Sequence, residues 1–122
     1  MREDVKHSLR EAMIICPMAD NTGKIQPNVY RGARDACITA FNGCTIRYAE
    51  GYWRGDDGKL FMENVAELMV VCNDDAANRE TLEAIADQIG YKHQQYAVYI
   101  RYASGNVVLR PTAQFWQTAK AG

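Results

Sequence analysis

The segment Leu60–Cys72 is apolar on both faces of an extended chain, and this property limits the possible folds more than any other. Successive side chains of a strand point to opposite sides. One side carries Ala66, Leu68, Val70 and Cys72, and the other carries Val65, Met69 and Val71. The segment Tyr96–Tyr102 is apolar on both faces as well. Both segments are therefore expected to lie inside a sheet that is covered on each side.

Apolar spacing and turn residues predict the other elements. A short apolar run, Ala12–Met18, is closed by Pro17 and predicts a first strand. A helix is predicted from Pro27 to Asn42, and a second helix from an N-cap among residues 73–75 to Gly90. The remaining predicted elements are a hairpin of Thr45–Trp53 and Leu60–Cys72 around the turn 55–58, the strand Tyr96–Tyr102, and a short segment, Val107–Leu109.

The order β-α-β-β-α-β is typical of the ferredoxin-like α+β fold, an antiparallel sheet with both helices on one face. Two helices cover only one face of the sheet, so the open apolar face predicts a homo-oligomer. The chain of 122 residues has the length of one domain. We expect a single domain over 1–122, with flexible segments at 1–10 and 112–122.

Composition excludes several classes of function. Lys and Arg number 14 against 15 Asp and Glu, a formal net charge of −1, which disfavours nucleic-acid binding. No apolar run approaches the roughly 20 residues of a membrane span. The first seven residues carry charges of both signs, unlike a signal peptide, and favour the cytoplasm.

Cysteines and histidines offer no recognisable metal site. The cysteines are Cys16, Cys37, Cys44 and Cys72, with no CxxC pair among them. His7 and His93 lack the spacing of zinc ligands, so no metal is expected. We expect reduced, buried thiols and two solvent-exposed histidines.

Two carboxylates interrupt an apolar strand face in the hairpin. Glu63 and Glu67 alternate with Phe61, Val65 and Met69. In one interpretation they lie at a rim or pair with Arg47, Arg54 or Arg101 of neighbouring strands. In the other they belong to a dry pocket with aromatic walls, suited to a cationic small molecule.

The hairpin resembles that of small phage-encoded enzymes that degrade S-adenosylmethionine (SAM), formerly called SAM hydrolases and now SAM lyases. The resemblance covers the order of elements from about Ala12 to Pro111. It rests on Gly51-Tyr52-Trp53-Arg54, an acidic turn, and Glu63 before the strand that ends at Cys72.

The resemblance implies a PII-like trimer of ferredoxin-like subunits with the active site between neighbours. It places the catalytic carboxylate at Glu63 and the catalytic tyrosine at Tyr52, with Glu67 as the competing carboxylate. The substrate-binding residues that it implies are Trp53, Phe61 and Met62.

The family's reaction needs neither a cofactor nor a strong base. The substrate's own carboxylate attacks its Cγ, which gives homoserine lactone and 5′-methylthioadenosine. The protein must fold the substrate and exclude water. Hydrolysis would need an activated water, and the sequence shows no evident histidine base or metal site for this purpose. A lyase is therefore favoured over a hydrolase.

Two other classes of function stay open. One is a non-enzymatic regulator of the PII type, although its long effector loop would have to fit the short connection between Arg54 and Lys59. The other is a partner-blocking protein that binds a host protein through its apolar sheet face.

Overall fold

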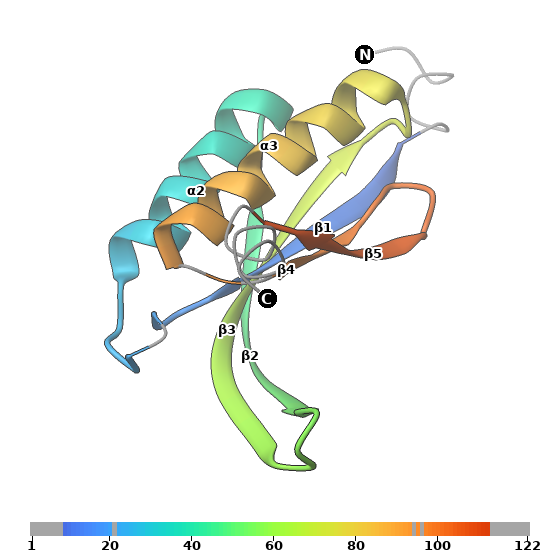
Figure 1. Cartoon of the computed structure of the whole chain (residues 1–122). Helices are drawn as coiled ribbons and strands as arrows, with labels where there is room; N and C mark the ends of the chain where they lie inside the picture. Colours follow the sequence, from blue (N-terminus) through green and yellow to red (C-terminus); the bar gives the residue numbers. More distant parts are fainter. Residues whose placement is uncertain (1–8, 21, 94, 96, 113–122) are drawn as a thin grey trace.

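The computed structural model describes residues 9–20, 22–93, 95 and 97–112, which form one five-stranded sheet and two helices (Figure 1). In chain order the elements are β1 Arg10–Pro17, α2 Pro27–Phe41, β2 Thr45–Arg54, β3 Leu60–Cys72, α3 Ala76–His93, β4 Ala97–Arg101 and β5 Val107–Pro111.

The sheet has the strand order β2-β3-β1-β4-β5 with antiparallel neighbours throughout. Both helices lie side by side on one of its faces (Figure 1). The predicted α+β class is confirmed, and the first four strands have the split β-α-β order of the predicted ferredoxin-like fold. The short segment expected at Val107–Leu109 is a fifth strand, which pairs with β4 along its whole length.

Helix α2 begins and ends where the sequence predicts. Pro27 occupies the first turn, where its missing N–H costs nothing. Asn42 ends the helix in the left-handed conformation, with φ 64°, and its N–H donates to the carbonyl of Ile38. The buried side chains are Tyr30, Ala33 and Cys37, so the helix turns Tyr30 toward the sheet.

Helix α3 is one turn longer than predicted. Its start is confirmed, because the Asp75 carboxylate accepts the N–H of Asn78 at 2.8 Å as an N-cap. Its end is a correction, because the helix passes through Gly90 and continues to His93. Gly90 is needed for close packing, since a Cβ at this position would overlap the side chain of Thr112.

The extra turn also corrects the expectation of an exposed His93. The imidazole is fully buried, because it continues the inward stripe of Leu82, Ala86 and Ile89. Neither ring nitrogen forms a hydrogen bond of good geometry with a described residue. Burial lowers the pKa of His93, and the carbonyl of Pro17 and the charge of Asp20 oppose this shift only in part.

The buried imidazole predicts a fold that is sensitive to acid. The unfolded chain binds a proton at His93 near pH 6.5, whereas the folded chain does so only at lower pH. Stability should therefore fall below about pH 6.5, by at most about 1.4 kcal/mol per pH unit from this group. Urea unfolding between pH 5 and 8 measures the slope. His93→Leu should flatten it, and an unchanged slope in this variant would contradict the assignment.

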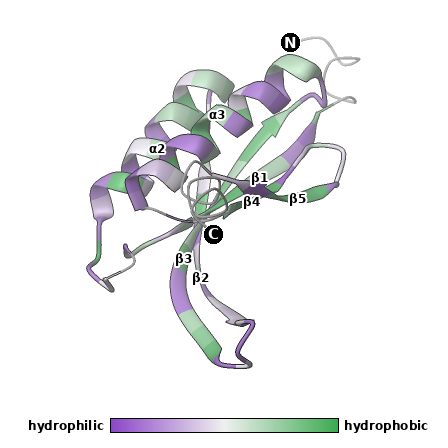
Figure 2. Cartoon of the chain, viewed as in Figure 1, coloured by the Kyte–Doolittle hydropathy of each residue, from purple (hydrophilic) through white to green (hydrophobic). Residues whose placement is uncertain are grey.

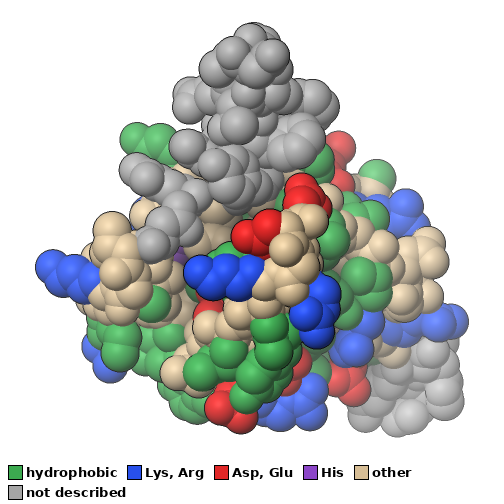
Figure 3. All heavy atoms as spheres, turned by 60° about the horizontal axis from the view of Figure 1, so that its bottom comes forward, with side chains coloured by type: hydrophobic (Ala, Val, Ile, Leu, Met, Phe, Trp, Pro, Cys, Tyr) green, Lys and Arg blue, Asp and Glu red, His purple; other side chains and the backbone are tan. Residues whose placement is uncertain are grey.

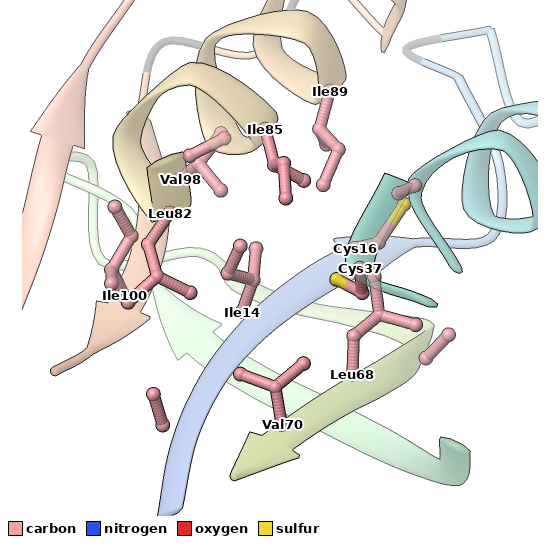
Figure 4. Close-up of a cluster of buried hydrophobic side chains, with 14 of the residues drawn as sticks. Ile14, Cys16, Cys37, Leu68, Val70, Leu82, Ile85, Ile89, Val98 and Ile100 are labelled. Atoms are coloured by element: carbon pink, nitrogen blue, oxygen red, sulfur yellow. The ribbon is translucent and has the colours of Figure 1, made fainter. Parts of the chain in front are cut away.

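The core lies between the helices and the sheet (Figure 4). It contains three of the four cysteines, Cys16, Cys37 and Cys72, which are buried as expected, whereas Cys44 is only partly buried. On the sheet side it contains the inward residues of β3 that the alternation predicts, Ala66, Leu68, Val70 and Cys72.

An ion pair links β5, the last strand of the sheet, to helix α3. Arg110 of β5 donates from Nε to Asp87 of α3 at 2.8 Å.

Next to β5, the strand β4 spans Ala97–Arg101, whereas the sequence predicts Tyr96–Tyr102. Tyr96 lies outside the described residues, and Tyr102 begins the turn, where its N–H donates to the Asn106 carbonyl.

Of the two segments that the sequence predicts to be flexible, 1–10 and 112–122, the structure describes residues 9, 10 and 112. Arg10 is the first residue of β1 and Thr112 is buried, so both belong to the folded body. Residues 1–8 and 113–122 lie outside the described residues. Within the described part, no helix combines the length and apolarity needed to cross a bilayer.

Candidate active site

The strands β2 and β3 continue beyond the rest of the sheet as a two-stranded arm, residues 50–64 (Figure 1). β1 pairs with β3 over residues 65–72, and the Met18 N–H donates to the Asn64 carbonyl, so among the described strands β2 alone pairs with residues 60–63 of β3. A tight turn at 55–59 closes the arm, with Gly58 at φ 80° and a hydrogen bond from the Gly55 N–H to the Lys59 carbonyl.

The arm carries apolar side chains that the body does not cover (Figure 2). Large exposed residues are concentrated in it: Tyr52, Trp53, Leu60, Phe61 and Met62. Viewed from the side toward which the arm projects, hydrophobic surface lies among acidic and basic side chains (Figure 3). Such a surface is suited to contact with a ligand or another subunit.

The register divides the predicted site residues between two faces. Gly51 pairs with Glu63 and Trp53 with Phe61, so Trp53, Phe61 and Glu63 share the face that continues the helix-free side of the sheet. Tyr52 pairs with Met62, and both lie on the other face. Within one chain, Tyr52 and Glu63 therefore point away from each other.

An aromatic pair lies on the Glu63 face. The rings of Trp53 and Phe61 are stacked, with centroids 5.7 Å apart and planes 17° from parallel. The ammonium of Lys59 lies 5.6 Å from the centroid of the Phe61 ring. The aromatic pair therefore already has a cation near one of its rings. A positively charged ligand would make the same kind of contact with these rings.

Glu63 is a half-buried carboxylate without a cationic partner. It forms no hydrogen bond or ion pair with any residue that the structure describes. Burial raises the pKa of its carboxyl above the ordinary value. A cation that bound beside Glu63 would stabilise the ionised form, so this position favours a cationic ligand.

Glu67 differs from Glu63 in having a partner. Arg47 lies directly across from it on β2, and their closest charged atoms, Arg47 Nε and Glu67 Oε1, are 3.4 Å apart. The interpretation as an ion pair therefore holds for Glu67 and not for Glu63. The structure leaves Glu63 as the free carboxylate of the two.

The Tyr52 face contains residues that the sequence analysis did not single out. Tyr48 and Asn64 continue this face toward the body, and Tyr48 packs edge-on against Tyr30 of α2, with ring centroids 6.1 Å apart. Strand alternation from Tyr52 could have found Tyr48. Its contact with a helix could not be read from the sequence.

The cysteines are poor nucleophiles in this fold. Burial raises the pKa of Cys16 and of Cys37 to about 12, so both thiols are protonated near neutral pH. The groups that remain for a reaction or for ligand binding are the carboxylate of Glu63 and the aromatic rings of the arm.

Comparison with known proteins gives matches in structure alone. No protein-family model matches the chain, and no curated protein matches it in sequence. A phage SAM lyase in complex with S-methyl-5′-thioadenosine superposes with a TM-score of 0.65, over 85% of this chain and 90% of that one, at 12% identity. The chain has the fold of a phage SAM lyase. A phage SAM lyase in the apo state superposes with a TM-score of 0.63, at 13% identity. The resemblance seen in the sequence is confirmed at the level of the fold.

Proposed function

We propose that the protein is a SAM lyase, which converts SAM to homoserine lactone and 5′-methylthioadenosine. The observation that carries the proposal is the unpaired, half-buried Glu63 beside the Trp53–Phe61 stack, on the arm of a chain with the SAM lyase fold. The ligand in one structural neighbour, S-methyl-5′-thioadenosine, is the nucleoside product of this reaction.

The reaction balances within the substrate. A carboxylate oxygen attacks Cγ, the Cγ–S bond breaks, and its electron pair stays on sulfur. The carboxylate and sulfonium charges disappear together and no proton moves. An environment of low dielectric favours this step, because the transition state is less charged than the ground state.

This charge balance suggests what Glu63 does. A carboxylate held against the sulfonium would stabilise the ground state more than the transition state. Contact with the substrate ammonium carries no such penalty, because the ammonium keeps its charge throughout. We therefore assign Glu63 to the ammonium. Trp53 and Phe61 would form an apolar wall that excludes water from the reacting carboxylate.

The division of Glu63 and Tyr52 between the two faces of the arm indicates how many copies of the chain form one site. A site that uses both Glu63 and Tyr52 takes them from two copies of the chain, since one chain directs them to opposite sides. This favours an assembly with its sites between subunits, and the resemblance to SAM lyases implies that the assembly is a homotrimer. Met62, next to Tyr52 on that face, would contact the substrate from the second copy.

The intersubunit site predicts complementation. Glu63→Gln and Tyr52→Ala should each lose most of the activity, and mixed trimers should contain some sites with both native residues. With random mixing at equal amounts, about a quarter of the sites qualify if each takes its residues from two copies. SAM turnover after co-refolding measures this. Additive activity of the two parents, with no gain on mixing, would contradict a shared site.

We also propose that residues 1–122 form a single domain that acts in the cytoplasm of the host cell. No cofactor takes part, because the substrate supplies both the nucleophile and the leaving group. Incubation of the purified protein with SAM, followed by chromatography, tests the activity.

A further inference from the structure

A groove with a volume of about 490 Å³ opens between α2 and α3. Its floor contains Ala33, Ile85 and Ile89, which belong to the hydrophobic core. None of its lining residues belongs to the arm, so the groove is separate from the proposed active site.

The groove exists because its walls are short side chains. Gly32 and Ala36 line it on α2, and Ala84 lines it on α3, and all three are exposed. Longer apolar residues at these positions would close the space between the helices. The volume falls in the range of roughly 300–1,000 Å³ that is common for small-molecule sites.

Lys92 gives the groove its charge. Among the described residues it is the one charged member of the lining, and it forms no ion pair with any of them. Its Nζ lies 3.9 Å from the place where a Cβ on Gly32 would be, so the side chain reaches from α3 to α2. A positive group at an apolar groove without a lining carboxylate complements an anion.

We propose that this groove binds a small molecule with an apolar body and one anionic group, and that Lys92 pairs with the anion. The body rests on the floor formed by Ala33, Ile85 and Ile89. The ammonium of Lys92 provides the charge contact at the groove.

Two naphthylamine probes separate the two parts of the site. The probe 1-anilinonaphthalene-8-sulfonate has an apolar body and one sulfonate, and N-phenyl-1-naphthylamine is its uncharged counterpart. Fluorescence titration of the native protein should show saturable binding of both at one site per chain. Lys92→Met should weaken binding of the sulfonate about fivefold, the worth of a partly exposed ion pair, and leave the uncharged probe unaffected.

Two variants serve as controls. Lys24→Met removes an exposed cation of the loop before α2 that is not part of the groove lining, and it should change neither titration. The double variant Ala36→Leu, Ala84→Leu should remove binding of both probes. If it does not fold, the comparison of Lys92→Met with Lys24→Met still decides. The proposal is wrong if Lys92→Met leaves sulfonate binding unchanged, or if the folded double variant binds both probes as the native protein does.

Discussion

Glu63→Gln should remove most SAM turnover while the fold stays intact. The substitution keeps the shape of the side chain and removes the charge that we assign to the substrate ammonium. A hydrogen bond to a charged group is worth roughly 1.5–3 kcal/mol, so kcat/KM should fall about ten- to a hundredfold. In the native protein, activity should decline as the pH falls through the raised pKa of Glu63, because protonation removes the same charge.

Glu67→Gln is the matched control on the same face of β3. Glu67 already has Arg47 as a partner, so this variant should keep near-native turnover. Tyr52→Phe, which removes one hydroxyl, should lower activity less than Glu63→Gln does. An inactive Glu67→Gln together with a fully active Glu63→Gln would move the site four residues along β3.

Val71→Asp should dissociate the proposed trimer and abolish activity with it. Val71 lies on the helix-free face of the sheet and is 54% exposed in the single chain, so the monomer tolerates a charge there. In a trimer built through this face, the same carboxylate would be buried without a partner, which costs several kcal/mol in order of magnitude. Light scattering after size exclusion measures the mass, and circular dichroism should be unchanged.

Ile25→Asp provides the comparison for this experiment. Ile25 is also an exposed aliphatic residue, at 62%, but it lies in the loop before α2 and not on the sheet face. Its variant should keep the native mass. The interface would be assigned to the wrong surface if both variants remained trimeric.

The strands of this fold could be predicted where their sequence pattern is local. The bounds of β3 match the prediction, since two alternating apolar sets end together at Cys72. The end of α3 could not be predicted. Glycine usually ends a helix, but Gly90 continues one because Thr112, distant in sequence, packs against it. The burial of His93 follows from the additional helical turn, which continues the inward stripe of α3.

The candidate site could be predicted in its residue types and not in its arrangement. The alternation of carboxylates and aromatics marked the hairpin. The register across the strands then decides that Arg47 faces Glu67, and the shorter β1 leaves residues 50–64 as an arm. Pairing between strands fixes both features, and a single strand's sequence does not contain them.

The most direct test of the proposed lyase is incubation with SAM in water labelled with oxygen-18, with rapid quenching and mass analysis. We expect 5′-methylthioadenosine together with homoserine lactone that carries no label. Homoserine formed later from the lactone should carry the label in its carboxyl group, because water then attacks the lactone carbonyl. Label in the γ-hydroxyl of homoserine, with no lactone before it, would contradict the lyase reaction, and absence of 5′-methylthioadenosine would contradict cleavage of SAM altogether.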